Sequence, residues 1–249
     1  MTKQLQPLVS VYPTVTELKE AAAELFATAA KAAMAAGQKF RVALAGGPTP
    51  QQFYELLATP PYCNTINWLQ VEVYWGDERF VPHSHPDRNY LMAKRAFLDK
   101  VAIPTANIYP MPTVPLTPEE AAATYEATIR RNFGLTGEQL PQFDLFLLGI
   151  GTDGHTASLF PGTAALHVKD RLVVANYIPQ LAAWRLTLTL PVINNAAQVV
   201  FLVAGAGKAD ILKKLLTDNT LTYPAQLVRP VNGRLYYLID TAANKYCSY

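Results

Sequence analysis

A glycine-rich segment with one acid and one histidine, Gly149 to Gly162, is the part of this sequence best suited to chemistry. It follows an apolar run, Phe143–Leu148, that predicts a buried strand. In open α/β sheets the ligand crevice lies beyond the carboxyl ends of the strands, and glycine lets the backbone approach a ligand there. Because imidazole exchanges a proton near neutral pH, His155 is a candidate base. The alternative is an ordinary strand-to-helix turn in which the histidine is structural or solvated.

A second glycine-rich turn, Gly46-Gly47-Pro48-Thr49-Pro50, follows the predicted strand Arg41–Ala45 and precedes a helix that runs to Leu57. Free N–H groups at a helix N-terminus favour an anion, so this turn is a candidate phosphate site. The Thr49 hydroxyl can contact a phosphate and can also cap the helix. An ordinary capped turn explains the same residues equally well, and the P-loop pattern is absent.

Three basic residues lie where predicted elements begin or end. Arg79 closes the cluster Trp75-Gly76-Asp77-Glu78-Arg79, and its fork of donors suits two phosphate oxygens or, alternatively, a surface ion pair with a neighbouring acid. Arg185 begins a strand of alternating residues. Lys208 lies at a helix start, where a cation is unfavourable and an anionic partner would explain it. A lysine that simply extends into water is the alternative.

The overall composition excludes several classes of function. The chain has 249 residues, of which 50% are hydrophobic, and a net charge of +2. We therefore expect one α/β domain over residues 1–249 with no nucleic-acid partner. No apolar run reaches the roughly 18 residues of a membrane span. No signal core precedes the first helix, so we expect a cytoplasmic protein without membrane contact. The spacing of His83, His85 and Asp87 is weak for zinc, and we expect no metal.

The elements that must position these residues follow from hydrophobic periodicity. Helical spacing predicts a helix over Thr14–Ala36, and Thr117 before Pro118 predicts the start of another. Strands alternate with helices through most of the chain, which predicts a doubly wound, mainly parallel sheet with helices on both faces. Residues 185–190 alternate apolar and polar side chains, so the sheet is expected to be locally mixed there. The other predicted strands are Arg41–Ala45, Val71–Trp75, Phe143–Leu148, Leu172–Ala175, Gln198–Ala204 and Leu235–Ile239, and Gly207–Thr217 is a predicted helix.

Four segments together resemble the 6-phosphogluconolactonase family, which hydrolyses the lactone made in the first step of the pentose phosphate pathway. They are the Gly46-Gly47-Pro48-Thr49-Pro50 turn, Trp75-Gly76-Asp77-Glu78-Arg79-Phe80-Val81-Pro82 with Asp87-Arg88-Asn89-Tyr90, the Gly149–Gly162 string, and Arg185-Leu186-Thr187-Leu188-Thr189 with Gly205–Lys208. They follow in the expected order across most of the chain. The resemblance implies an α/β fold shared with glucosamine-6-phosphate deaminases and ribose-5-phosphate isomerases.

The resemblance also implies roles for residues of this chain. His155, with Asp153 as its acidic neighbour, matches the general base for water attack on C1 of 6-phospho-D-glucono-1,5-lactone, without a cofactor. The implied phosphate and substrate contacts are Gly46, Gly47, Thr49, Arg79, Arg185 and Lys208. An oxyanion needs donors, and the backbone N–H groups of Gly149, Gly151 and Gly154 are the candidates. The expected partner is this small phosphorylated sugar lactone. The oligomeric state stays open between a monomer and a weak dimer.

Some residues depart from the family pattern. Pro48 stands where serine is more usual, which removes a hydroxyl and a backbone N–H. The stretch Tyr177–Trp184 lacks the usual Lys-Pro-Pro. The closest rival is a glucosamine-6-phosphate deaminase or isomerase, whose loop usually continues through Ala-Phe-Asn-Glu-Pro-Gly. This chain reads Ala157-Ser158-Leu159-Phe160-Pro161-Gly162 instead. A non-catalytic sugar-phosphate sensor is a further alternative, although no DNA-binding segment is visible.

Overall fold

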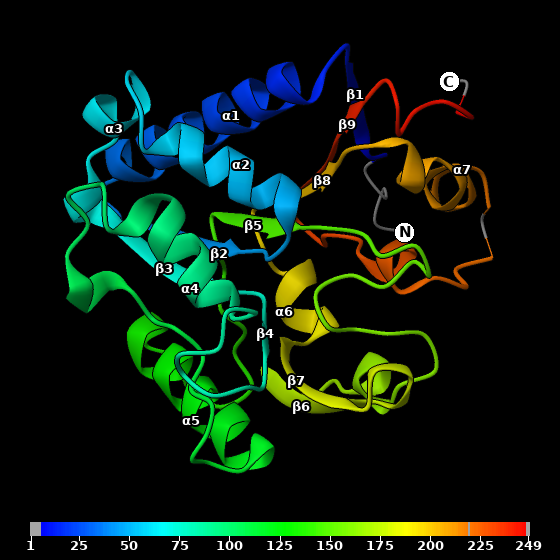
Figure 1. Cartoon of the computed structure of the whole chain (residues 1–249). Coiled ribbons are helices and arrows are strands. Elements are labelled where there is room, and N and C mark those ends of the chain that lie inside the picture. The colour runs from blue at the N-terminus through cyan, green and yellow to red at the C-terminus, as the bar shows by residue number, and fades with distance from the viewer. Residues whose placement is uncertain (1–5, 219, 248–249) are drawn as a thin grey trace.

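Two sheets form the centre of the computed structural model, which describes residues 6–218 and 220–247 (Figure 1). The larger sheet is parallel, with the strand order β1-β9-β8-β5-β2-β3. Its strands are β1 (Leu8–Tyr12), β2 (Phe40–Leu44), β3 (Val71–Trp75), β5 (Leu145–Leu148), β8 (Gln198–Val203) and β9 (Arg234–Asp240). The smaller sheet is antiparallel in the order β4-β7-β6, with β4 (Asp77–Arg79), β6 (Val173–Ile178) and β7 (Ala183–Leu188).

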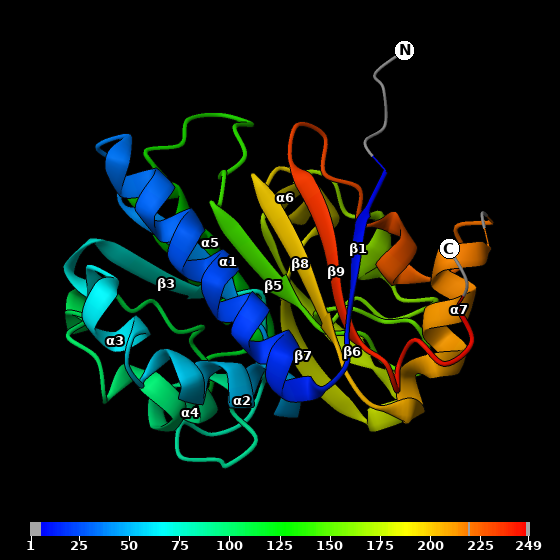
Figure 2. The same cartoon turned by 90° about the horizontal axis from the view of Figure 1, so that it is seen from above.

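Helices cover both faces of the larger sheet, as Figures 1 and 2 show. On one face lie α1 (Val15–Ala35) and α2 (Pro48–Leu57). On the other lie α5 (Pro118–Phe133) and the smaller sheet, against which α5 packs. The shorter helices are α3 (Tyr62–Thr65), α4 (Asn89–Ala93) with its π-helical continuation η2 (Lys94–Leu98), α6 (Leu190–Asn194) and α7 (Ala209–Thr217). The predicted doubly wound fold is therefore confirmed.

Local sequence explains where the two longest helices begin. Thr14 caps α1, because its hydroxyl accepts the Glu17 N–H at 3.2 Å while the Glu17 carboxylate accepts the Thr14 N–H at 2.9 Å. Thr117 and Glu120 form the same capping box at α5. A cap of this kind contributes about 1 kcal/mol, so two four-residue patterns fix both starting points. The helix predicted after Thr117 is confirmed by this geometry.

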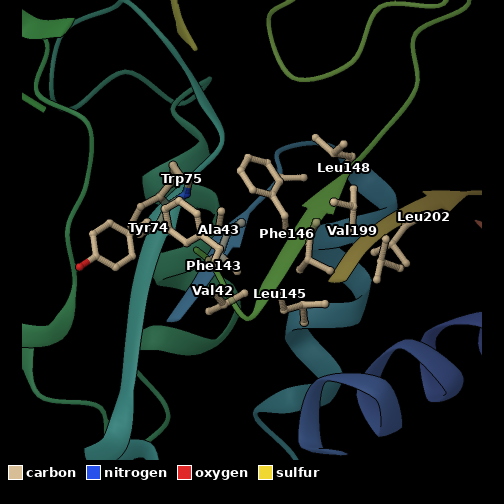
Figure 3. Packing of buried hydrophobic residues seen from close by; sticks show 14 of the residues in the cluster. Val42, Ala43, Tyr74, Trp75, Phe143, Leu145, Phe146, Leu148, Val199 and Leu202 are labelled. Carbon is tan, nitrogen blue, oxygen red and sulfur yellow. The ribbon is translucent and has the colours of Figure 1, made fainter. Parts of the chain in front are cut away.

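The core lies on both faces of the parallel strands. Strands buried on both sides read as continuous apolar runs, as β5 does, and β3 is interrupted only by the buried Glu72. Figure 3 shows Phe146 of β5 within a row of side chains that extends across the sheet from Trp75 of β3 to Leu202 of β8. All three side chains are buried. Close packing of this kind fixes the ends of these strands relative to one another.

The order of the strands determines where a ligand can bind. The chain runs outward from β2 to β3 and then crosses to the opposite side of β2 to form β5. In a doubly wound sheet a crevice opens at the carboxyl ends where the direction of winding reverses. The loops after β2 and β5 border that point, and they are the two glycine-rich segments of the sequence.

Several predicted boundaries need correction. The strand predicted over Arg185–Leu190 begins at Ala183 and ends at Leu188, because Pro191 in the first turn of α6 starts a helix there. It pairs antiparallel with β4 and β6, which confirms the mixed region. Gly207 and Lys208 belong to a short 3-10 turn, and α7 begins at Ala209. The strands β1 and β4 were not predicted.

Candidate active site

A cavity of about 320 Å³ opens at the carboxyl edge of the parallel sheet. Four segments line it, and each follows a different strand of the parallel sheet. They contribute Gly46, Gly47 and Thr49 after β2, Asp77 and Arg79 after β3, Gly149, Gly151 and His155 after β5, and Lys208 after β8. Segments from across the sequence thus converge at the switch point. Asp153, Gly154 and Arg185 are not in direct contact with this cavity, although each lies beside a residue that is.

His155 and Asp153 form a hydrogen-bonded pair in the loop after β5. The Asp153 Oδ1 atom lies 2.6 Å from the His155 Nδ1 atom and also accepts the His155 backbone N–H at 3.1 Å. These two bonds close a tight turn that lets side chains two residues apart meet. Partial burial acts to raise the pKa of Asp153. The N–H groups and charge of His155 outweigh this effect and hold the pKa below its usual value.

Two neighbours fix the imidazole ring. The Phe160 ring stacks on it, with centroids 3.9 Å apart and planes 17° apart. On another side Gly151 leaves just enough room, because a Cβ atom there would collide with both the imidazole and the Asp153 carboxylate. Gly151 is thus required for packing rather than for a positive φ. Ala157, two residues after the histidine, lines the same cavity and has φ 47°. Strained residues of this kind concentrate at functional sites.

Lys208 joins the loop after β8 to the loop that carries this pair. Its Nζ atom donates to the Ile150 carbonyl at 2.7 Å and faces the cavity. Burial lowers the pKa of Lys208, and the negative charge of Asp153 opposes that shift. A partly desolvated ammonium group of this kind can pair with an anion bound in the cavity.

Two arginines lie opposite each other on the smaller sheet. Arg79 of β4 and Arg185 of β7 are directly paired in the antiparallel ladder. Burial and the positive charge of Arg79 lower the pKa of Arg185, and within the described part of the chain its Nε atom is buried without a hydrogen-bond partner. Like charges opposite each other destabilise a sheet. Such a pair is typical of a site that binds an anion.

The N-terminus of α2 faces the same cavity. Gly47 is its N-cap, with φ 102°, and Thr49 occupies the second helical position. Thr49 therefore does not cap the helix, which corrects that part of the prediction. Pro48 and Pro50 have no N–H group, so Gly47 and Thr49 supply the anion-facing donors of the first turn.

The three glycines predicted as oxyanion donors differ in what their N–H groups do. The Gly151 N–H donates to the His155 carbonyl at 2.8 Å, and the Gly154 N–H donates to the Gly151 carbonyl at 3.0 Å. Both groups shape the loop, so in this arrangement neither is free to donate to an oxyanion. Gly154 has φ 80° and packs against Tyr223, which explains the glycine there. Gly149 alone of the three remains a candidate.

Sequence reasoning missed two buried residues that line the cavity, Asp77 and Asn89. The Asp77 carboxylate accepts the Ser158 hydroxyl at 2.7 Å, and the Asn89 amide donates to the Asp77 carbonyl at 3.0 Å. Asn89 also lies against Gly46, where a Cβ atom would displace its amide. The cluster of acids after β3 was the signal for Asp77, and the signals for Asn89 were its place at a helix start and in the segment Asp87-Arg88-Asn89-Tyr90 that resembles the family.

Glu78 is the buried acid next to this pair. Its carboxylate accepts the N–H groups of Arg79, Asn89 and Tyr90 at 2.9, 2.7 and 3.0 Å. Burial raises its pKa despite these bonds and the nearby Arg88 guanidinium. Glu78 therefore fixes the start of α4 and holds β4 in place beside the cavity.

His83 does not join His85 and Asp87 in one cluster, although the His85 and Asp87 side chains lie 3.8 Å apart. The His83 ring pairs with the Arg88 guanidinium at 2.9 Å, and the His85 ring accepts the Asp87 N–H at 3.2 Å. Among residues 6–218 and 220–247, no three His, Cys, Asp or Glu side chains are grouped closely enough to hold a metal ion. Within the same ranges, no helix combines the length and the apolar character that crossing a bilayer requires.

A second cavity of about 570 Å³ lies away from all four segments. Its lining comes from the start of β1, the end of α7, residues 226–230 and the start of β9, and includes Val9, Leu215, Arg229, Leu235 and Tyr237. None of the glycine-rich segments contributes to it. The chemistry therefore concentrates in the first cavity, although the second is larger.

A doubly wound sheet with an imidazole–carboxylate pair and several cations at its switch point defines an acid–base enzyme of small anionic substrates.

The chain belongs to the glucosamine-6-phosphate isomerase/6-phosphogluconolactonase family, whose model matches residues 13–237. A 6-phosphogluconolactonase from Synechocystis sp. is 47% identical over 82% of this chain and 83% of that protein. One from Nostoc sp. is 39% identical over 96% of this chain and 98% of that protein. The solved structure of 6-phosphogluconolactonase from Trypanosoma cruzi superposes with a TM-score of 0.88 at 27% identity, covering 100% of this chain and 99% of that chain. Within the family the chain groups with the 6-phosphogluconolactonases, which are lactone hydrolases.

Proposed function

We propose that this enzyme hydrolyses 6-phospho-D-glucono-1,5-lactone to 6-phospho-D-gluconate, with His155 as the general base. One observation carries the proposal: the imidazole held by Asp153 faces a cavity that also holds the N-terminus of α2 and the Lys208 ammonium. A base and an anion site in one cavity suit a substrate with a carbonyl at one end and a phosphate at the other. The matching relatives named 6-phosphogluconolactonase support the same substrate.

The orientation of the imidazole sets its role. A carboxylate only accepts hydrogen bonds, so the Asp153 contact keeps the proton of neutral His155 on Nδ1. The Nε2 atom then carries the lone pair and takes a proton from the water that attacks C1. A base of this kind contributes about 10² to 10⁴ in rate. As the imidazolium forms, the Asp153 carboxylate stabilises its charge. When the oxyanion collapses and the bond between C1 and the ring oxygen breaks, the imidazolium returns its proton to that leaving oxygen.

The phosphate end anchors the substrate. We propose that the N–H groups of Gly47 and Thr49, the Thr49 hydroxyl and the Lys208 ammonium contact the phosphate. Gly46 lets the Asn89 amide pack beside this turn. Arg79 and Arg185 complete its electrostatic environment. Binding energy from this remote group fixes C1 near His155, which lowers the entropic cost of the reaction. Gly149 is the glycine that we retain as a donor to the oxyanion.

A lactonase assay with freshly prepared 6-phospho-D-glucono-1,5-lactone tests this proposal. The spontaneous rate of ring opening is subtracted, and 6-phospho-D-gluconate is measured as the product. We expect the wild type to accelerate hydrolysis and His155→Ala to lose at least about 100-fold in kcat with little change in KM. A variant that retains kcat within a few-fold would show that His155 is not the base. Release of ammonia from glucosamine 6-phosphate would instead favour the deaminase alternative.

A further inference from the structure

Asp240, at the carboxyl end of β9, lies outside every segment that the sequence singled out. Its side chain is 4% exposed. Both of its carboxylate oxygens lie 3.0 Å from the Gly205 nitrogen, and Oδ1 also accepts the Ala243 N–H at 2.8 Å. Within the described part of the chain no salt bridge involves Asp240. Its charge is therefore directed at backbone N–H groups, and the first of these belongs to the loop that leads to the cavity.

Gly205 is the residue at which the chain turns away from β8. It has φ 91°, a conformation that favours glycine, and its carbonyl accepts the Lys208 N–H at 3.0 Å. A single turn therefore separates the Asp240 contact from the Lys208 backbone. The Lys208 side chain then extends across to the Ile150 carbonyl at 2.7 Å. Ile150 lies between Gly149 and Gly151 in the loop that carries the imidazole–carboxylate pair.

These contacts form one continuous path from β9 to the catalytic loop. We propose that Asp240 is a positioning residue that acts through Lys208: it holds the Gly205 turn so that the ammonium faces both the Ile150 carbonyl and the substrate phosphate. The proposal rests on the proposed function, because it assigns Lys208 to the phosphate. A charge-assisted bond to a backbone N–H is stronger than a neutral one, which explains a carboxylate at a site that a neutral cap would also fit.

A double-mutant cycle between Asp240 and Lys208 tests the proposal. The four proteins are the wild type, Asp240→Asn, Lys208→Met and the double variant, and kcat and KM are measured for each with 6-phospho-D-glucono-1,5-lactone. We expect Lys208→Met to raise KM about tenfold and Asp240→Asn about fivefold, with smaller changes in kcat. If Asp240 acts through Lys208, Asp240→Asn has no further effect on KM in the Lys208→Met protein.

Glu126 provides a matched control. It is also buried, at 7% exposed, and its carboxylate accepts the Leu172 N–H at 3.0 Å, but it joins α5 to β6 away from the cavity. The effects of Glu126→Gln and Lys208→Met on KM should be additive. Additive effects of Asp240→Asn and Lys208→Met would overturn the positioning role and leave Asp240 as a structural cap. If Asp240→Asn does not fold, Asp240→Ser, whose hydroxyl can accept one N–H, replaces it in the same cycle. A wild type without lactonase activity would instead contradict the proposed function.

Discussion

At the scale of single residues, the site depends on the close packing of His155, Asp153 and Gly151. The Asp153 carboxylate binds both the ring and the backbone N–H of His155, and the missing side chain of Gly151 provides the space for that pair. The residue types were readable from the sequence, since an acid, a histidine and glycines near a strand end are typical of catalysis. The contacts of these residues could not be predicted from the sequence, because Gly151 and Gly154 could equally have presented free N–H groups.

The variant Asp153→Asn isolates the charge of this side chain from its shape. The amide oxygen of the introduced asparagine can still accept both bonds from His155, so the loop should stay folded. We expect kcat to fall by about 100-fold, because a neutral partner stabilises the imidazolium less, while KM changes little. Steady-state kinetics with the phosphorylated lactone measure this change. Asp170→Asn, at an exposed acid, serves as control and should leave kcat unaltered. Equal rates for Asp153→Asn and the wild type would contradict the catalytic role of the pair.

The buried ammonium of Lys208 predicts a pH dependence of binding. Because burial lowers its pKa, the free enzyme loses this charge at a lower pH than an ordinary lysine would. In the proposed mechanism the positive form of Lys208 binds the phosphate, so the Kd for 6-phospho-D-gluconate should rise as the pH increases through that lowered pKa. Calorimetric titrations measure this Kd between about pH 7 and 10. The phosphate itself stays ionised throughout that pH range.

Lys208→Arg provides the matched comparison for this titration. Arginine keeps its charge throughout this range, so the rise in Kd on the alkaline side should disappear even if binding at pH 7 is weaker. Identical pH profiles for both proteins would show that Lys208 does not contact the phosphate.

At the scale of elements, the sequence predicted what has a local cause. The capping boxes at Thr14 and Thr117 and the apolar run of β5 are complete within a few residues, so these elements were found close to their true bounds. The strand β4 is only three residues long and polar, and it exists because β7 pairs with it. The edge strand β1 likewise needs β9 as its partner. Elements defined by distant partners carry little signal of their own.

The same pairing that produces β4 brings Arg79 opposite Arg185. Since these like charges repel and Arg185 is partly desolvated, Arg185→Gln should raise the melting temperature of the ligand-free protein by about 2 to 4 °C. It should also weaken 6-phospho-D-gluconate binding about tenfold. Thermal unfolding and calorimetry measure both changes, and Arg234→Gln, at an exposed position of β9, is the control. A variant that binds as tightly as the wild type would remove Arg185 from the anion site.

At the scale of the whole molecule, the fold brings four segments from distant parts of the sequence to one edge of the sheet. The segments at residues 46–49, 76–79, 149–155 and 204–208 each follow a buried strand, so their relative positions are fixed by the core (Figure 3). None of them could form the cavity alone. The sequence could predict their common edge from the parallel topology, but the hydrogen bonds between them depend on side-chain placement that no single segment determines.

A ligand that contacts all four segments should slow amide hydrogen exchange in all of them. At about 100 times its Kd, a product bound only to the native state adds about 2.7 kcal/mol of stability. With 6-phospho-D-gluconate present, we therefore expect slower amide hydrogen exchange in residues 46–49, 76–79, 149–155 and 204–208 than in the surrounding chain. The larger cavity beside Tyr237 offers an internal comparison, and its lining segments should show no such local protection. The His155→Ala protein should show the same pattern, because it retains the phosphate contacts and lacks only the base. Protection centred on the Tyr237 cavity would place the ligand in the wrong part of the fold for this mechanism.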